Sequence, residues 1–375
     1  MSDSDNYEGG NVLWVTSQDV KSHYLDGTTT QITEKGAKEL TLYPAGSLVM
    51  VTRSGILRHT LPVAELRKPS TVNQDIRVIL PQGKYYGQWL LQFFISRNKE
   101  LLLEFGKTGT TVESVDFSKM RDMVLLTPSL PEQQQIGHYF ARLDNLITLH
   151  QRKYDKLCVL KKSMLDKMFP KGGSLYPEIR FAGFTDPWEQ RKLGEVASKR
   201  IEKNTNGIKE TFTNSAEHGI VSQLDYFDHD ITNDANIGNY SVVYPDDFVY
   251  NPRISAIAPC GPINRNKLGR NGVMSPLYTV FSVDDMINKL YLEHYFTTNR
   301  WHQFMFLEGN SGARSDRFSI SDSTFFEMPI QCPVLEEQEL IALFFDRLDT
   351  LITLHQRKLE LLRNIKKSML DKMFV

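Results

Sequence analysis

The sequence is poor in cysteine, and that scarcity excludes two classes of protein. Its 375 residues include three cysteines, Cys158, Cys260 and Cys332, which lie far apart, form no CxxC pair and leave one thiol over in any disulfide scheme. Secreted domains held together by disulfides use cysteine densely and in even numbers. No cluster of Cys and His has the spacing of a metal site either. We therefore expect reduced thiols and no bound metal.

The sequence also has no excess charge and no long apolar run. The formal net charge is −1, so any binding to a polyanion must come from local clusters of Lys and Arg or from partner subunits. No apolar run approaches the roughly 18 residues of a membrane span. The first ten residues, MSDSDNYEGG, lack the cationic lead and apolar core of a secretory signal. We expect a soluble cytoplasmic protein of two domains, because the length exceeds what a single core serves.

Motifs for catalysis are missing as well. The string GKTGT at 106–110 resembles a phosphate loop, but the glycine that such a loop needs five residues earlier is replaced by Leu101. Asn251 and Pro252 follow a strand-like run, as in adenine methyltransferases, yet no glycine-rich cofactor loop accompanies them. No HExxH string and no nucleophile elbow occurs. We predict a chain without catalytic residues or cofactor, although scattered Asp and Glu leave a nuclease as an alternative.

What the sequence does contain is an internal repeat. LITLHQRK at 146–153 recurs at 351–358, and KKSMLDKMF at 161–169 recurs at 366–374. Sliding the segment that begins at Pro131 onto the one that begins at Glu336 matches about 25 of roughly 39 positions without a gap. Weaker sequence similarity relates residues 42–55 to 243–255 and residues 106–120 to 309–323. Each half therefore comprises a divergent domain followed by a nearly constant segment.

The constant segments have helical periodicity. Apolar residues step by alternating four and three positions, which is typical of a helix with one apolar seam. Two seams this similar predict that the helices pack on each other as an antiparallel coiled coil with pseudo-two-fold symmetry, rather than each on its own domain. His150 and His355 occupy equivalent seam positions and are predicted to set the register of the pair. The seam residues are Ile136, Phe140, Leu143, Ile147, Leu157, Ile341, Phe345, Leu348, Ile352 and Leu362.

The rest of the chain mixes strand-like and helix-like runs. Short β-branched runs (SLVMV, IRVIL, FVYN, LYTVF) alternate with longer apolar stretches such as YYGQWLLQFFISRNKELLLEF and LYLEHYFTTNRWHQFMFL. We predict two mixed α/β (α+β) domains in tandem, each followed by a long helix. The predicted bounds are 1–130 for the first domain, 131–169 for its helix, 170–187 for a linker, 188–335 for the second domain and 336–375 for its helix.

These strings together resemble a known family. PEQQQI, HQRK and KKSMLDKMFP, then YPEIRFAGFTDPWEQRKLGEV, then LEEQELI with the second copies, are similar to the specificity subunit of type I restriction-modification enzymes over almost the whole chain. The resemblance implies two target-recognition domains that each read half of a bipartite DNA site, while the helices set the spacing and dock methyltransferase subunits, and through them restriction subunits. The sequence departs from this pattern at the front, where the first domain has no counterpart to WEQRKLGEV and is predicted to be truncated.

Side chains that read base edges or fix phosphates are expected on loops beside the strand-like runs. Arg53 and Arg253 are the most specific candidates, because the same residue follows a strand-like run in each half. For either of them, a structural role as an Arg paired to a carboxylate is an equal alternative. The other candidates in the first half are Trp14, Thr16, Ser17, Ser54, Arg58, Asn73, Gln74, Lys107 and Thr110. Those in the second half are Asn214, Ser215, Arg265, Asn266, Ser275, Ser311, Arg314 and Arg317. A coiled-coil scaffold that binds only proteins is the rival function.

Overall fold

The chain forms two compact units, and each long helix contributes to both of them. The structure is a computed structural model that describes residues 4–109, 112–226, 237–310 and 316–374. One unit comprises Met1–Arg152 with His355–Val375, and the other comprises Lys153–Leu354. Three of the predicted contact residues, Thr110, Ser311 and Arg314, lie outside the described residues.

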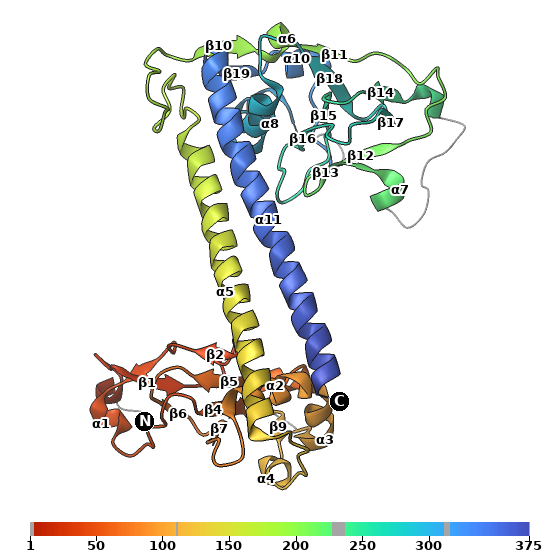
Figure 1. The fold of residues 1–375 in the computed structure, drawn as a ribbon. Coiled ribbons are helices and arrows are strands. Elements are labelled where there is room, and N and C mark those ends of the chain that lie inside the picture. The colour runs from red at the N-terminus through yellow and green to blue at the C-terminus, as the bar shows by residue number, and fades with distance from the viewer. Residues whose placement is uncertain (1–3, 110–111, 227–236, 311–315, 375) are drawn as a thin grey trace. The chain divides into compact units, whose positions relative to one another are not determined.

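The first unit is built on a mixed sheet with the strand order β2-β5-β4-β7, beside a smaller sheet with the order β3-β1-β6 (Figure 1). β4 is the central strand, and all four of its residues are buried, because alternate side chains enter two separate apolar clusters. Its strands are β1 (Val12–Val15), β2 (Tyr24–Leu25), β3 (Gln31–Ile32), β4 (Leu48–Val51), β5 (Val63–Leu66), β6 (Ser70–Val72), β7 (Ile76–Ile79), β8 (Gly106–Lys107) and β9 (Ser114–Val115). Its helices are α1 (Glu34–Ala37), α2 (Gly87–Ser96), α3 (Asn98–Phe105), α4 (Phe117–Arg121) and the start of α5 (Leu130–Lys167).

The second unit repeats this plan with additions. Its main sheet has the order β11-β18-β15-β16, and β15 takes the central place of β4. Its strands are β10 (Glu189–Lys192), β11 (Ala197–Lys199), β12 (Phe212–Ser215), β13 (Gly219–Ser222), β14 (Ser241–Val243), β15 (Phe248–Tyr250), β16 (Ile263–Arg265), β17 (Gly272–Met274), β18 (Thr279–Val283) and β19 (Pro329–Cys332). Its helices are α6 (Leu193–Val196), α7 (Gln223–Tyr226), α8 (Lys289–Thr297), α9 (His302–Glu308), α10 (Asp322–Phe326) and α11 (Leu335–Met373).

The mixed α/β class and the two long helices predicted from the sequence are confirmed. Each of the four strand-like runs lies on a strand, namely β4, β7, β15 and β18. The two long apolar stretches each form a pair of helices, α2 with α3 and α8 with α9. Both pairs break at the polar residues between them, around Arg97 and Asn299.

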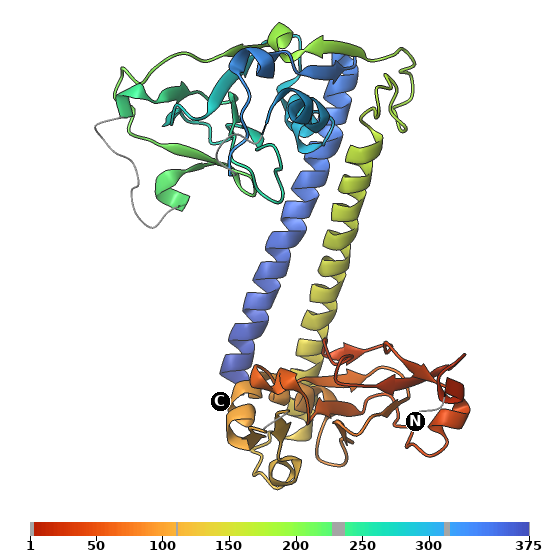
Figure 2. The ribbon, with the colours of Figure 1, turned by 180° about the vertical axis from the view of Figure 1, so that it is seen from behind.

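In the first unit, the start of α5 meets the end of α11. Figure 2 shows the last turn of α11 beside α2 and α3, where Phe374 contacts Trp89, Phe93 and Phe140. Lys366 of α11 donates to the carboxylate of Asp144 on α5 at 2.6 Å, and both side chains are 11% exposed.

Other polar groups complete this contact. Tyr24 and Gln92 also donate to Asp144, so the buried carboxylate has three hydrogen-bond donors. His150 and His355 meet further along, with their Nδ1 atoms 2.8 Å apart. Because residue numbers rise along α5 where they fall along α11, the two helices are antiparallel in this unit.

The second unit has the reciprocal arrangement. Phe169, just after α5, packs against Phe345 of α11, and Lys161 of α5 pairs with Asp349 of α11 at 2.5 Å. Lys161 is the repeat equivalent of Lys366, and Asp349 is the equivalent of Asp144. The seam residues predicted from the repeat are buried or half-buried in the unit that contains them. Each unit thus contains the beginning of one long helix and the end of the other.

Removing the buried lysine of the first unit should destabilise it. We expect Lys366→Met to lower the free energy of unfolding by about 3 kcal/mol, because the Asp144 carboxylate stays buried without its cation. Urea denaturation followed by circular dichroism measures this. Lys367→Met is the matched control, since Lys367 is exposed. Equal losses for both variants would contradict the assignment, and adding Asp144→Asn to Lys366→Met should recover part of the loss.

A buried histidine should make the second unit sensitive to acid. Burial and the nearby Lys161 charge lower the pKa of His294 to about 4, against the opposing effect of Glu293 and Asp349. In the unfolded chain the imidazole of His294 is protonated near pH 6.5, whereas in the folded chain it is not protonated until about pH 4. Stability is therefore present above about pH 6.5 and falls as the pH is lowered towards about 4.

Gln92 occupies the position of His294 in the first unit, so His294→Gln is the natural test variant. We expect it to reduce the difference between urea midpoints at about pH 7.5 and about pH 5, because the variant has no imidazole to protonate. The exposed His218 provides the control His218→Gln, which should leave the pH dependence as it is. An unchanged pH dependence in His294→Gln would count against the buried imidazole as its source.

Candidate functional site

Arg53 and Arg253 occupy the same structural position in the two units. Each follows the central strand of its main sheet, and each forms an isolated antiparallel bridge, Arg53 with Ser114 and Arg253 with Arg317. Both side chains are exposed. Within the described ranges, neither guanidinium takes part in an ion pair. The two arginines therefore lie at matching places in the fold, and their contact with a ligand stays a prediction.

The bridge is made by the same two backbone hydrogen bonds in each unit. On one side, the amide of Ser54 donates to Glu113 and that of Ile254 donates to Asp316, at 3.1 and 2.9 Å. On the other side, Val115 donates to Thr52 and Phe318 donates to Pro252, at 2.9 and 2.7 Å. We call this pair of bonds the arginine clasp. It fixes the backbone on both sides of the arginine while the side chain faces solvent.

A turn supports the clasp in the second unit. The side chain of Asn251 accepts from the amide of Arg253 and donates to the carbonyl of Asn214. Gly261 faces this turn with a φ of +87°, and a Cβ at that position would lie 2.0 Å from the carbonyl oxygen of Asn251. Only glycine combines this backbone conformation with so close an approach. The Asn251 side chain therefore holds the start of the Arg253 loop.

A groove of about 530 Å³ lies beside Arg253. Its walls come from the β12–β13 hairpin and from the loop that follows Arg253. It is lined by Thr213, Asn214, Ser215, Ala216, Glu217, Tyr226, Asn251, Arg253, Ile254, Ser255, Ala256, Ile257, Pro262 and Tyr278. A guanidinium at the edge of a groove with amide, hydroxyl and phenol groups can offer several hydrogen bonds to one planar ligand.

The other predicted cations of the first unit are engaged in ion pairs. Arg58 pairs with Glu113, and Lys107 pairs with Asp116. These contacts hold the pKa of Glu113 and of Asp116 below their usual values, through the hydrogen bond from Arg58 and the hydrogen bond from Lys107. Each of these cations already has a carboxylate partner beside the arginine clasp.

Arg265, a predicted contact residue of the second unit, is also paired with carboxylates. It contacts Asp246 and Glu293, and its side chain is 16% exposed. Burial raises the pKa of Glu293, but Lys267 and Arg265 outweigh it and bring that pKa below its usual value. Arg265 therefore serves the structure of the second unit.

Two predicted contact residues lie in the interior. Asn214 is 2% exposed and donates to the carbonyls of Val249 and Pro262, while Asn266 is 1% exposed and donates to Tyr244 and Arg270. Buried backbone carbonyls need such donors. The expectation that these asparagines face a ligand is corrected, because their side-chain amides bind the protein's own backbone.

The remaining candidates mostly shape local turns. The Thr16 hydroxyl donates to Asp19, Asn73 contacts Asp75, and the hydroxyls of Ser54, Ser215 and Ser275 accept from amides two or three residues ahead. Trp14 is half-buried in β1 and contacts the ring of Tyr7. Ser17 and Arg317 are half-buried and Gln74 is exposed.

Asn251, Thr213 and Tyr278 are among the groove residues that sequence reasoning missed. Asn251 was considered only as part of a methyltransferase motif, and Thr213 and Tyr278, whose hydroxyls lie 3.2 Å apart, were not considered. The pairing of β12 with β13 places Thr213 beside the groove, and the sequence gives no sign of that pairing.

In the part of the chain that the structure describes, neither a metal site nor a membrane span is present. Among the described residues, no group of three or more His, Cys, Asp or Glu side chains is placed to hold a metal ion. In the same part of the chain, every helix is too short or too polar to cross a bilayer.

Comparison with known proteins gives a consistent result. The model of the type I restriction modification DNA specificity domain matches residues 1–158 and 185–364. The chain is 29% identical over 162 residues to the EcoR124I/EcoR124II specificity subunit of Escherichia coli, which is 40% of each chain. It is 23% identical over 305 residues to the putative MjaX specificity subunit of Methanocaldococcus jannaschii, covering 76% of this chain and 66% of the relative.

The alignments therefore span between 40% and 66% of the length of these curated relatives. Among solved structures, the S subunit of a type I restriction-modification system from M. genitalium is similar with a TM-score of 0.58. That similarity covers all of this chain and 91% of the other at 10% sequence identity, which supports the fold alone.

Proposed function

Because the chain belongs to the family of type I restriction modification DNA specificity domains, we propose that it is a non-catalytic subunit that reads a bipartite DNA sequence. In this proposal, residues 1–130 and 188–335 are two target-recognition domains, each for one half of the site. The observation that carries the proposal is the duplicated arginine clasp, which presents an exposed Arg at the same place in both units.

The chemistry of the clasp suits base reading. A guanidinium donates two parallel hydrogen bonds, which match the O6 and N7 acceptors of guanine in the major groove. A rigid backbone on both sides reduces the entropy lost when the side chain binds. In the second domain, the groove beside Arg253 adds the hydroxyl groups of Thr213 and Tyr278 within the same surface. Arg58 and Lys107 pair with carboxylates in the free protein. They can exchange these partners for DNA phosphates, because a polyanion competes for the cations.

The long helices support the spacing part of the proposal. α5 has 38 residues and α11 has 39, so each extends about 57 Å at 1.5 Å per residue. Antiparallel contacts between them occur in both units. We propose that they pair along their length as a coiled coil, hold the two domains at a set distance, and dock methyltransferase subunits and, through them, restriction subunits. A scaffold that binds only proteins would fail to shift DNA in a gel when the methyltransferase partner is present.

Loss of Arg253 should relax one base position. We expect Arg253→Ala to cost about 1 to 3 kcal/mol of discrimination at one base of one half-site, because its bidentate donors are lost. Mapping methylated sites in cells that express the whole system shows which position relaxes. Arg191→Ala, which removes an Arg already paired with Glu189, is the control. An unchanged site preference for Arg253→Ala would contradict the base-reading role.

Lengthening both helices should lengthen the stretch of unrecognised bases between the two halves of the DNA site, here called the gap. Seven residues inserted after Tyr154 and seven after His355 keep the seam in phase and add about 10 Å to each helix. At 3.4 Å per base pair, the gap should grow by about three base pairs. Sequencing of methylated sites measures the gap. The control is a variant in which seven existing residues at each place are replaced by the inserted sequence, so that the length of the helices does not change. A constant gap would refute the spacer role.

A further inference from the structure

The groove beside Arg253 carries charges of both signs on two separate elements. Arg253 follows β15, and Glu217 lies in the turn of the β12–β13 hairpin, which forms another wall of the groove. Both side chains are exposed. Among the described residues, no ion pair joins the Arg253 guanidinium to the Glu217 carboxylate. A basic group beside Glu217 is the imidazole of His218, whose Nε2 atom lies 3.8 Å from the carboxylate, beyond hydrogen-bonding distance.

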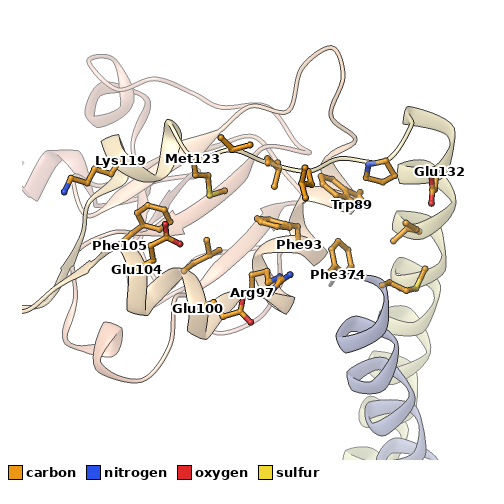
Figure 3. A pocket seen from close by; sticks show the side chains of 17 residues that line it. Trp89, Phe93, Arg97, Glu100, Glu104, Phe105, Lys119, Met123, Glu132 and Phe374 are labelled. Carbon is orange, nitrogen blue, oxygen red and sulfur yellow. Dashed lines mark hydrogen bonds and ion pairs between the residues drawn. The ribbon is translucent and has the colours of Figure 1, made fainter.

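A cavity of the first unit has the opposite arrangement. It has a volume of about 680 Å³, and Figure 3 shows Arg97 close to Glu100 on its wall. These two residues are three positions apart at the start of α3, so their side chains face each other and form an ion pair at 2.5 Å. Each charge there is satisfied by the other. Arg253 and Glu217 do not satisfy each other, so both can act on a ligand in the groove.

A chain of hydrogen bonds fixes the backbone of Glu217 relative to that of Arg253. The side chain of Asn251 accepts from the amide of Arg253 at 3.0 Å and donates to the carbonyl of Asn214 in β12 at 2.8 Å. The hydroxyl of Ser215, the next residue of β12, accepts from the amide of Glu217 at 3.3 Å. The turn that carries the carboxylate and the loop that carries the guanidinium are therefore connected through one strand.

A second asparagine secures this connection to the main sheet. The side chain of Asn264 in β16 donates to the side-chain oxygen of Asn214 at 2.7 Å and to the carbonyl of Ser215 at 3.3 Å. Asn214 is 2% exposed, and its own amide donates to the carbonyl of Val249 in β15. A buried polar network whose members are satisfied makes a structure rigid. The two charges are thus attached to a backbone that holds them at set positions on the groove.

A carboxylate on a surface that faces DNA needs a specific partner. The phosphates repel it, so Glu217 would weaken binding to DNA unless it accepts a hydrogen bond from a base. In the major groove, the donors are the N4 amino group of cytosine and the N6 amino group of adenine. The position of Glu217 on the same groove as Arg253 therefore indicates a base edge that offers acceptors to the guanidinium and a donor to the carboxylate.

We propose that the groove reads one G·C base pair, with Arg253 donating to O6 and N7 of guanine and Glu217 accepting from N4 of cytosine. This inference rests on the proposed function and adds the identity of one base pair to it. The major-groove edge of G·C has two adjacent acceptors beside one donor. An A·T pair would present its amino group to the guanidinium and the O4 acceptor of thymine to the carboxylate, so both contacts would fail.

Mapping of methylated sites in cells that express the whole system tests the shared base pair. Glu217→Ala and Arg253→Ala should relax the same base pair of the same half-site, each lowering the preference for G·C by about tenfold. Glu217→Gln should keep part of the preference, because its amide oxygen still accepts from N4. Glu195→Ala is the matched control, since it removes an exposed carboxylate of α6 that is not part of the groove, and it should leave the site unchanged.

A gel shift with the full chain and its methyltransferase partner separates base reading from a structural role. On the specific duplex, Glu217→Ala should bind about tenfold more weakly than the unaltered chain. On a duplex of unrelated sequence it should bind at least as tightly, because one charge that repels phosphates has been removed. A purely structural role of Glu217 would weaken binding to both duplexes alike. Circular dichroism checks that each variant is folded.

Three results would overturn this inference while the system still methylates a bipartite site, so that the proposed function stands. They are relaxation of two different base pairs by the two alanine variants, relaxation of an A·T pair, and an unchanged site preference for Glu217→Ala. If the unaltered system methylates no bipartite sequence, the proposed function and this inference fail together.

Discussion

In each unit, one Lys–Asp contact joins the end of one long helix to the start of the other. Lys366 from the end of α11 reaches Asp144 near the start of α5, and Lys161 from the end of α5 reaches Asp349 near the start of α11. A repeating apolar seam alone would tolerate a slip of one heptad, because each step meets an equivalent residue. A slip here would leave a partly buried carboxylate without its cation. Within each unit, the ion pair therefore favours the observed contact over a slipped one.

The same constraint links each domain to both helices. Asp144 also accepts from Tyr24 and Gln92 of the first domain, so one carboxylate binds α11, β2 and α2 together. In the second unit, His294 stands at the position of Gln92 and packs against Phe345. A neutral imidazole at this position packs against its neighbours but donates no hydrogen bond to Asp349. Within the described residues, the Asp144 carboxylate thus has more hydrogen-bond donors than the Asp349 carboxylate.

Much of this architecture could be predicted because it is periodic. The repeat, the helical seam and the β-branched runs are patterns in which position along the chain determines which face is buried. The equivalence of Arg53 and Arg253 could be predicted for the same reason. The roles of Asn214, Asn266 and Arg265 could not, because a polar side chain acquires its role from the partner it meets. Those partners, such as Val249 and Glu293, come from strands and helices whose pairing the sequence does not reveal.

The arginine clasp keeps the same backbone geometry in two domains whose loops differ. The two hydrogen bonds of each clasp join backbone atoms only, so the side chains of Glu113 and Asp316, or of Val115 and Phe318, can change without breaking it. The backbone position of the arginine is thus fixed while the side chains around it are free to vary. Under the proposed base-reading role, divergent loops around a constant arginine are the outcome expected from that division.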